Sequence, residues 1–158
     1  MKKESWALTL LISFVIVFGA GIIGSSFVNG GYSTAWYLNH RSAFTPPNYA
    51  FGVVWNILFV LIALSLFFAL QGAGKGRERW IVVCVYGINL ILNALWSLFF
   101  FGMMNAFLGL VDLFLVWLTI IGMIYVSFKI DRRAAWLLIP YLIWVTFAGV
   151  LNVLFLMN

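Results

Sequence analysis

Residues 58–70 read LFVLIALSLFFAL, and residues 110–126 read LVDLFLVWLTIIGMIYV. Both runs are apolar on every side of a helix, whereas the strands of a membrane barrel alternate apolar and polar residues over about ten positions. A helix rises about 1.5 Å per residue, so about twenty apolar residues cross a hydrocarbon core of about 30 Å. The two runs therefore predict transmembrane helices.

These two runs belong to a set of five such apolar stretches, which together make up nearly the whole chain. They cover residues 6–28, 48–71, 80–101, 106–128 and 134–157. Hydrophobic residues make up 65% of the 158 and charged residues only 8%, with a mean hydropathy of +1.11, whereas a soluble domain is about 25% charged. We expect an all-α fold, a single domain over residues 1–158 that forms an integral membrane bundle of five transmembrane helices. We expect this multi-pass protein to be located in a bacterial cell membrane.

The first stretch has a second interpretation. Lys2 and Lys3, followed by an apolar run that ends in small residues, are also typical of a cleaved signal peptide. The apolar run over residues 6–23 is longer than the usual h-region of about 7 to 15 residues, so it can span the membrane by itself. We therefore keep it as a helix of the bundle.

Positive charge falls almost entirely on one side of the five predicted spans. Arg41 lies alone on the other side, and the remaining cations are Lys2, Lys3, Lys75, Arg77, Arg79, Lys129, Arg132 and Arg133. The positive-inside rule then places the N-terminus in the cytoplasm, and the C-terminus and an outer lid loop, residues 29–47, outside. The net charge of +5 thus reflects topology and suits anionic lipid head groups; nucleic acid is not an expected partner.

Conventional catalytic and metal-binding patterns are missing from the sequence. His40 and Cys84 are the only histidine and cysteine, and no CxxC, HExxH, GxSxG or phosphate-binding glycine loop is present. Acid–base and nucleophilic catalysis need paired titratable groups, and Asp112, the only acidic or basic residue within a predicted span, has no evident His, Lys or Cys partner. We expect no metal site, no resident cofactor and no conventional enzyme.

Polar residues at membrane depth are costly and are therefore candidates for function. Counted from the outer helix ends, Asn93, Asp112 and Asn152 lie about 12, 9 and 8 Å deep. Such residues also bond helices to one another, at about 0.6 kcal/mol each, but their convergence at one depth favours a ligand cavity that opens outward. Helical spacing places aromatic and small residues beside them in three stripes: Asn89, Asn93 and Trp96; Trp144, Ala148 and Asn152; and Phe51, Trp55 and Phe59.

The lid loop is the only long connection between the predicted spans. It begins with Gly30-Gly31 and ends with Pro46-Pro47, so we expect an ordered segment folded over the helix ends. A loop of this length in so short a chain is usually functional. Arg41 is its only cation and suits a ligand carboxylate; phosphate head groups or a helix end are the alternative partners.

Four separated segments carry a further signal. Residues 36–55 read WYLNHRSAFTPPNYAFGVVW, residues 93–102 read NALWSLFFFG, residues 110–113 read LVDL, and residues 136–152 read WLLIPYLIWVTFAGVLN. In this order they resemble the translocator protein family, also called the tryptophan-rich sensory proteins. The first segment is similar to that family's pattern WYxxLxKPxWxPPxxxFxxxW. The resemblance covers residues 36–152.

The lid departs from the family pattern. Aligned on the two prolines, Arg41 stands where the family has lysine, Ser42 where it has proline and Phe44 where it has tryptophan. The departures affect the expected ligand preference more than the fold. No tyrosine near the fifth span has the flanking residues of the cholesterol consensus, so sterol recognition is not expected.

The resemblance implies a five-helix bundle, often a homodimer, that binds protoporphyrin IX and similar planar hydrophobic ligands beneath the first loop. Some family members also promote light-dependent breakdown of bound porphyrin, and Trp55 and Trp144 match the tryptophans to which that activity is attributed. The resemblance assigns Trp36, Pro46, Trp55, Asn93, Trp96, Asp112, Trp144 and Ala148 to the cavity, and the stripes and the lid add Phe51, Asn152 and Arg41.

Two further expectations concern oligomeric state and transport. Ala20 with Gly24, and Gly21 with Ser25, form small-xxx-small pairs on the first span, which favour a homodimer. The alternative function is transport of tetrapyrroles or other hydrophobic small molecules across the membrane. Transporters usually show internal repeats or broken helices at the midplane, and the sequence offers only one mid-span proline, Pro140. We therefore favour a receptor-like or sensor-like protein.

Overall fold

Five membrane-spanning segments account for nearly all of the structure, a computed structural model that describes residues 3–158, with side chains from Trp6 onward. Every regular element within residues 3–158 is helical, which confirms the predicted all-α bundle of five spans. The predicted cytoplasmic Lys2 and the side chain of Lys3 lie outside the described residues. Helices long and apolar enough to cross a membrane run over Trp6–Ser33, Asn48–Gly72, Arg77–Gly102, Ala106–Ile130 and Arg132–Met157.

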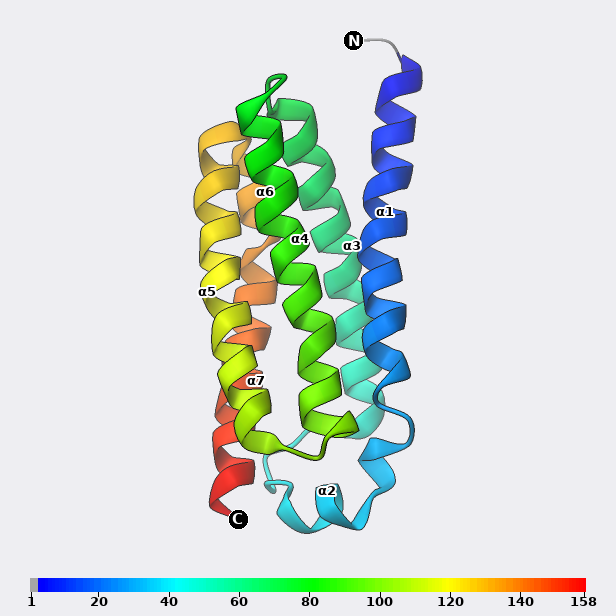
Figure 1. Cartoon of the computed structure of the whole chain (residues 1–158), viewed down its shortest axis with the longest axis vertical. Helices are drawn as coiled ribbons and strands as arrows, with labels where there is room; N and C mark the ends of the chain where they lie inside the picture. The colour runs from blue at the N-terminus through cyan, green and yellow to red at the C-terminus, as the bar shows by residue number, and fades with distance from the viewer. Residues whose placement is uncertain (1–2) are drawn as a thin grey trace.

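The spans lie side by side (Figure 1) and share a core of buried hydrophobic side chains. The long helices are α1 (Lys3–Ser26), α3 (Asn48–Gly72), α4 (Arg77–Ser97) and α5 (Ala106–Ile130), and the fifth span consists of α6 (Arg132–Leu137) and α7 (Ile139–Met157). Helix α1 packs against α3 and α4, α5 packs against α4 and α7, and α6 packs against α3. We call the end with the connections at residues 73–76 and 131 the basic end, and the end with residues 27–47 the lid end.

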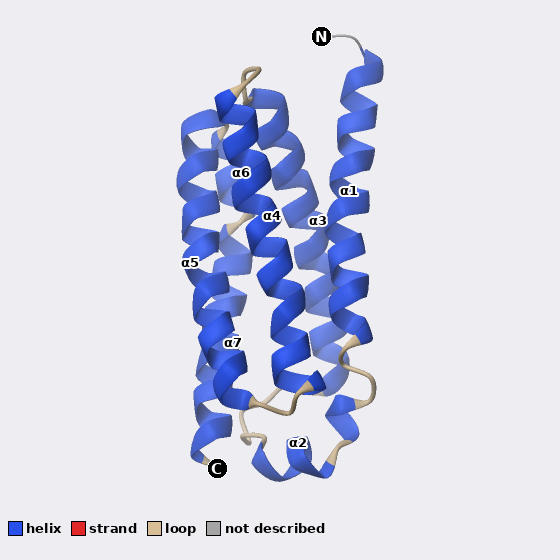
Figure 2. Ribbon diagram, in the orientation of Figure 1, coloured by secondary structure: helices blue, strands red, loops and turns tan. Residues whose placement is uncertain are grey.

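The whole connection between α1 and α3, residues 27–47, is itself folded (Figure 2); it includes the predicted loop 29–47, and from here on we call it the lid. It contains a single turn, η1 (Gly31–Ser33), and a short helix, α2 (Ala35–His40), joined by short loops. Gly30 takes a left-handed conformation with φ of 75°, which glycine adopts without steric cost. Thr34 caps α2 by accepting a hydrogen bond from the Tyr37 N–H at 3.2 Å. The lid is therefore a defined surface over the helix ends.

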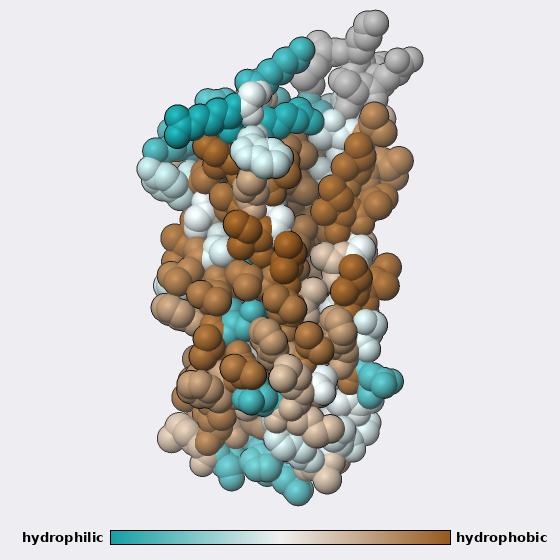
Figure 3. All heavy atoms as spheres, in the orientation of Figure 1, coloured by the Kyte–Doolittle hydropathy of each residue, from teal (hydrophilic) through white to brown (hydrophobic). Residues whose placement is uncertain are grey.

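On the face shown in Figure 3, hydrophobic side chains form a broad belt along the spans, and hydrophilic ones gather at the basic end. Large apolar side chains such as Leu11, Val15, Ile91 and Phe114 are exposed, as expected for a surface that hydrocarbon solvates. The cations of the basic end are Lys75, Arg77, Arg79, Lys129, Arg132 and Arg133. The assignment of this end to the cytoplasm stays a prediction from the positive-inside rule.

The fifth span is broken where the sequence shows Pro140. This proline is the second residue of α7, and it has no N–H to donate to the preceding turn. Because the Leu138 N–H donates to the Ala135 carbonyl at 3.1 Å, the Ala134 carbonyl loses its usual helical donor. The Ser65 hydroxyl donates to that carbonyl at 2.7 Å. Ser65 of α3 thus supplies the donor that the Ala134 carbonyl lacks at the break, and this bond holds α3 against the segment from which α7 begins.

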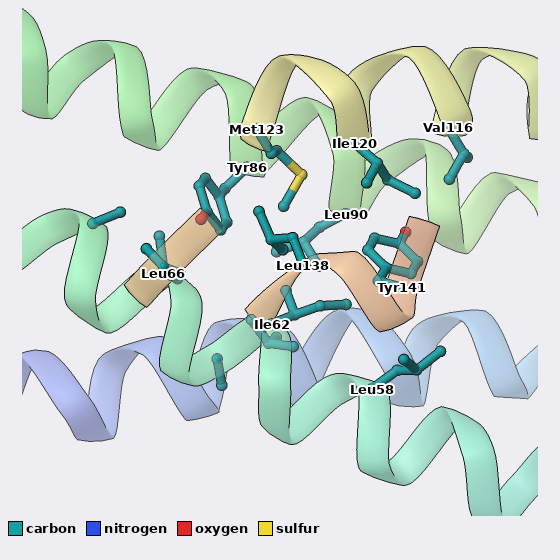
Figure 4. Close-up of a cluster of buried hydrophobic side chains, with 14 of the residues drawn as sticks. Leu58, Ile62, Leu66, Tyr86, Leu90, Val116, Ile120, Met123, Leu138 and Tyr141 are labelled. Carbon is teal, nitrogen blue, oxygen red and sulfur yellow. The ribbon is translucent and has the colours of Figure 1, made fainter. Parts of the chain in front are cut away.

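The half of the bundle toward the basic end is filled with side chains (Figure 4). Ile62, Ile120, Met123 and Leu138 are fully buried and come from three different spans. Among them lies Tyr86, whose hydroxyl is 2.6 Å from the Ser65 oxygen and 2.9 Å from that of Ser127. Buried hydroxyls that are paired in this way cost little in a close-packed interior.

Small residues hold α1 against α3 and α4. A Cβ added to Gly21 would lie 2.5 Å from the ring of Phe59, and one added to Gly24 would lie 3.3 Å from the Cα of Ala94. Gly21 and Gly24, one residue from each pair that was interpreted as a dimer contact, therefore face the chain's own helices, because small residues allow close helix approach within a chain as well as between chains. This stripe does not support a homodimer, and homodimerisation stays a prediction.

Helix α4 ends in a π-helical turn that the sequence analysis did not anticipate. The turn, η2 (Leu98–Gly102), closes with a hydrogen bond from the Met103 N–H to the Leu98 carbonyl at 2.8 Å. The ring of Phe101 in this turn lies 2.5 Å from the position that a Cβ on Gly31 would occupy. The lid is therefore in direct contact with the end of α4, and only a glycine fits at the contact.

Candidate ligand-binding cavity

A cavity of about 530 Å³, which we call the main cavity, lies among α1, α3 and α4 beneath the start of the lid. Its volume falls in the range of about 300 to 1,000 Å³ that is usual for small-molecule sites. Four residues predicted for the site, Phe51, Trp55, Asn93 and Trp96, lie together in its wall. The remaining lining residues are Phe18, Gly21, Ile22, Gly24, Ser25, Val28, Asn29, Gly30, Tyr32, Asn48, Gly52, Asn56, Phe59 and Ser97.

The main cavity opens between α1 and α3. Ile22 and Ser25 on α1, and Gly52 and Asn56 on α3, line the cavity and are also exposed at the surface. All four belong to membrane-spanning segments, so the opening faces the bilayer. The sequence analysis expected the cavity to open outward and assigned no residue of the first span to it, whereas in the structure the opening lies between two spans and α1 supplies a whole wall.

Flat aromatic side chains form the inner wall. The ring centroid of Trp55 lies 5.4 Å from that of Phe59 and 6.1 Å from that of Tyr141. Trp96 is stacked on Phe100 with a centroid separation of 5.2 Å and an interplanar angle of 16°. Rings at these distances hold one another in defined orientations. The wall therefore offers fixed, polarizable faces to a planar ligand.

The polar side chains of the main cavity are uncharged. They belong to Ser25, Asn29, Tyr32, Asn48, Asn56, Asn93 and Ser97. Asn93 is held in place, because its Nδ2 donates to the Tyr141 hydroxyl at 3.0 Å and that hydroxyl donates to Asn89 Oδ1 at 3.2 Å. Asn89 itself is fully buried. Of the two asparagines of the α4 stripe, Asn93 thus reaches the cavity and Asn89 supports it.

A second cavity of about 40 Å³ lies directly under the lid. Phe51 and Trp96 line both this space and the main cavity, while Ala148 and Asn152 line only the small one. The side-chain amide of Asn152 can be oriented so that its nitrogen and its oxygen both form hydrogen bonds. The nitrogen then donates to the Ala106 carbonyl at 3.0 Å, and the oxygen accepts from the Leu110 N–H of α5 at 3.3 Å. Ala148 and Asn152 therefore lie behind the inner wall, and Asn152 ties α7 to α5.

Arg41 and Pro46 line a shallow cavity of about 650 Å³ on the lid. Asn48, the first residue of α3, lines both this shallow cavity and the main one. Arg41 follows α2, where its N–H donates to the Tyr37 carbonyl at 3.0 Å. Burial raises the pKa of the Tyr37 hydroxyl, and the charge of Arg41 opposes that effect. The predicted guanidinium thus lies beyond the edge of the main cavity, not inside it.

Trp36 and Trp144 line neither the main nor the small cavity. The ring centroid of Trp36 lies 4.6 Å from that of Phe155, so this indole packs the lid onto α7. The ring centroid of Trp144 lies 5.8 Å from that of Phe51, which places Trp144 one ring behind the cavity wall. The sequence pattern correctly placed these aromatic residues near one end of the bundle. It could not show which of them line a cavity and which pack behind the cavity wall.

Asp112 also lies outside the lining of both cavities. It is only 3% exposed, and its Oδ2 and the Nε1 of Trp96 are the buried polar side-chain atoms that have no hydrogen-bond partner among the described residues. A buried polar atom without a partner costs about 1 to 3 kcal/mol, so each such atom calls for an explanation, such as strain, a role in catalysis or a bound water or ion. Among the same residues, no three His, Cys, Asp or Glu side chains come close enough to hold a metal.

Helix α1 is the part of the site that sequence reasoning missed. Phe18, Gly21 and Ser25 belong to its cavity-facing side. The signal was present in the spacing of small residues on this helix, but that spacing does not identify which helix they contact. The lid residue Tyr32, which lines both the main and the small cavity, was missed as well.

Known sequences match this chain over nearly its full length. The sequence model of the TspO/MBR family matches residues 12–157. The chain belongs to the TspO/MBR family. Five membrane-spanning segments make this TspO/MBR protein a multi-pass integral membrane protein, and relatives from Chlorobaculum tepidum and Bacillus cereus support a bacterial membrane.

Three TspO/MBR relatives indicate how far the similarity extends. The tryptophan-rich protein TspO of Chlorobaculum tepidum is 35% identical over 96% of this chain and 95% of its own. The protein of the same name from Archaeoglobus fulgidus is 36% identical over 96% and 97%. The translocator protein of Homo sapiens is 31% identical over 82% of this chain and 78% of its own. The similarity thus includes the first span, which carries one wall of the cavity.

Proposed function

We propose that this protein is a receptor-like or sensor-like membrane protein that binds porphyrins of the protoporphyrin IX type, and similar planar hydrophobic ligands, in the main cavity. The observation that carries the proposal is a space of about 530 Å³ with indole walls and no charged lining residue. Indole rings provide large, rigid faces for a planar partner. Relatives named tryptophan-rich sensory protein and translocator protein agree with a protein that handles a ligand.

The ligand's ring system would lie against Trp55 and Trp96. An acidic substituent finds no cation inside the main cavity, but Asn48 connects that cavity to the shallow one that contains Arg41. A propionate that extends past Asn48 would meet the Arg41 guanidinium, which binds carboxylates in two-point contacts. This arrangement would leave the apolar ring system in the membrane and its charged group at the lid.

Light-dependent breakdown of bound porphyrin would depend first on Trp55. This indole lines the main cavity, whereas Trp144 contacts Phe51 from behind. The activity would need no paired titratable groups, because the indole and the excited ligand supply the chemistry. We therefore propose photochemical breakdown as a secondary property of the binding site.

Transport of the ligand across the membrane is the alternative function. Ile62, Tyr86, Ile120 and Met123 fill the bundle beyond the cavity and are at most 1% exposed. A ligand would have to separate these close-packed side chains in order to cross. This packing favours binding, and ligand-dependent flux of protoporphyrin IX into liposomes that contain the protein would reverse that preference.

Titration of the purified protein with protoporphyrin IX, followed by tryptophan fluorescence, tests the proposal. Binding in the main cavity gives saturable quenching, and Trp55→Phe weakens it by up to about tenfold, because an aromatic contact is worth about 0.5 to 1.5 kcal/mol. Trp117→Phe is the matched control, because Trp117 lines a different groove, between α5 and α7. There its Nε1 donates to the Thr146 hydroxyl at 3.0 Å. Linear quenching at all concentrations would show that porphyrin merely partitions into detergent.

A further inference from the structure

Two cations at the basic end lie over aromatic rings of α5. Lys129 Nζ lies 4.2 Å from the ring centroid of Tyr125, and the guanidinium carbon of Arg132 lies 5.1 Å from the ring centroid of Phe128. Tyr125, Phe128 and Lys129 share one face of the helix, because they stand three and four residues apart. The two positive charges are therefore gathered at one corner of the bundle, where α5 ends and α6 begins.

The two charges at this corner have no carboxylate partner among the described residues. The ion pair formed there joins Asp131 to Arg133 at 2.8 Å, and Asp131 also caps α6. The guanidinium of Arg133 lies over a different ring, that of Phe68. The nearby carboxylate is thus committed to Arg133, and Lys129 and Arg132 keep their full charge for a partner outside the chain.

The free polar groups of these side chains are all hydrogen-bond donors. An ammonium group has three N–H bonds, a guanidinium has five, and neither group can accept. Lys129 uses one of its donors on the Tyr125 hydroxyl oxygen, so the hydroxyl proton of Tyr125 is left for another acceptor. A group of charged donors without an acceptor matches a phosphate, whose oxygens accept.

The position of the rings favours a lipid as the source of that phosphate. Tyr125 is 61% exposed and Phe128 is 49% exposed, and both belong to the membrane-spanning segment Ala106–Ile130. Each cation stands four residues beyond its ring, which is about 6 Å, or one helical turn, nearer the end of the span. A phospholipid presents acyl chains and then a phosphate in the same order, whereas a free phosphate ion would use only the cations.

We propose that Tyr125, Lys129 and Arg132 form a binding site for one anionic phospholipid, whose phosphate lies between the two cations and whose acyl chains lie along Tyr125 and Phe128. The net charge of the chain suits anionic lipids in general, whereas this site binds a single lipid molecule through defined contacts. Basic side chains beside membrane spans recognise anionic head groups in this way. The site lies at the end of the bundle opposite the lid, so it does not depend on the proposed function.

Native mass spectrometry of the full chain, released from detergent, counts the lipids that stay bound. The protein is titrated with phosphatidylglycerol, or with phosphatidylcholine that carries the same acyl chains. Each cation close to an anionic group favours its binding by about fivefold. The wild-type protein should therefore bind its first phosphatidylglycerol on the order of twentyfold more tightly than phosphatidylcholine.

Three variants and one control separate the site from the general charge of the basic end. Lys129→Gln and Arg132→Gln should each lower the preference about fivefold, and both side chains are exposed, so neither variant disturbs the core. Tyr125→Phe keeps the ring and every charge, and loss of its hydroxyl donor should lower phosphatidylglycerol affinity about two- to tenfold. Arg77→Gln is the matched control, because it removes the same charge from an exposed position in the first turn of α4, outside the site; it should leave the preference unchanged.

An equal loss of preference in all three glutamine variants overturns the inference, because the lipid would then respond to the total charge of the basic end. Equal affinity of the wild-type protein for the two lipids overturns it as well. Inorganic phosphate in excess, compared with sodium chloride at the same ionic strength, tests the source of the ligand. Phosphate should leave the lipid bound, and displacement beyond that in sodium chloride would show that the site takes the free anion and would overturn the assignment to a lipid.

Discussion

The ring centroids of Phe51 and Trp144 lie 5.8 Å apart, with an interplanar angle of 69°. Phe51 lines the main cavity and Trp144 does not, so Trp144 reaches a bound molecule only through Phe51. Trp55 lines the cavity itself. The two indoles to which the family resemblance attributes porphyrin photochemistry are therefore unequal in this protein.

Trp55→Phe is expected to slow the light-dependent loss of bound protoporphyrin IX more than Trp144→Phe does, because of these two indoles only that of Trp55 lines the main cavity. The measurement is the decay of porphyrin absorbance under constant illumination, at ligand concentrations that saturate each variant. Trp117→Phe, in the separate groove between α5 and α7, should decay like the wild type. An unchanged rate in the Trp55→Phe, Trp144→Phe double variant would remove the photochemical part of the proposed function.

Gly21→Ala is expected to destabilise the bundle by about 1 to 3 kcal/mol, the usual cost of overpacking, since the new methyl group would meet the Phe59 ring at 2.5 Å. Thermal unfolding in detergent measures the loss. Gly19→Ala on the same helix is the control, because a Cβ there meets nothing within 4 Å, and alanine is the better helix former. Equal melting temperatures for the two variants would contradict the close contact of α1 with α3.

Tyr86→Phe is expected to lower stability by about 1 kcal/mol while leaving porphyrin affinity unchanged. The hydroxyl of Tyr86 joins Ser65 to Ser127 in the filled half of the bundle, and each buried bond within a membrane is worth about 0.6 kcal/mol. Unfolding and ligand titration on the same preparation separate the two effects. A loss of porphyrin affinity would mean that the cavity extends into the basic half.

The capping residue of α6 gives the bundle a pH dependence at acid pH. Asp131 accepts from the Arg133 N–H at 2.9 Å and pairs with its guanidinium at 2.8 Å. The side-chain hydrogen bond from Arg133 holds the pKa of the Asp131 carboxyl below its ordinary value. Since the folded-state pKa is lowered, the stabilisation is present above about pH 3.9, the ordinary pKa of aspartate, and is lost as the pH falls through the folded-state value.

Asp131→Asn retains a capping oxygen but removes the charge. The wild type should therefore melt at a slightly higher temperature than Asp131→Asn at neutral pH, and the two melting curves should converge as the pH falls below about 4. The difference is expected to be small, because the Arg133 side chain is 70% exposed and solvent screens the pair. A difference that persists unchanged at low pH would show that the charge of Asp131 has no part in it.

The five spans could be predicted because burial in hydrocarbon imposes one strong constraint on composition over about twenty residues at a time. The break before α7 was visible only as Pro140, since the sequence does not show that Ser65, far away in α3, accommodates it. The π-helical turn η2 had no signal. Phe100 and Phe101 of this turn pack beneath the lid against Tyr37 and Phe155, and these are tertiary contacts that the local sequence does not show.

The candidate site could be predicted in part. Helical spacing correctly brought Phe51, Trp55, Asn93 and Trp96 to one cavity, because residues three or four apart share a face. Spacing does not say which neighbouring helix that face meets, so Gly21 was assigned to a second copy of the chain. A residue's place in the lid is still less constrained, and the sequence therefore could not show that Arg41 lies outside the main cavity.

The π-helical turn at Leu98–Gly102 makes the contact between the lid and the end of α4 sensitive to the insertion or deletion of a single residue in that turn. A one-residue deletion there would restore ordinary α-helical winding and rotate the following residues by about 100°. Phe101 would then leave its contact with Gly31, while every helix and every cavity-lining indole kept its identity. Relatives that differ at this turn by a single inserted or deleted residue should thus differ in how the lid covers the ligand, even where their aromatic residues are the same.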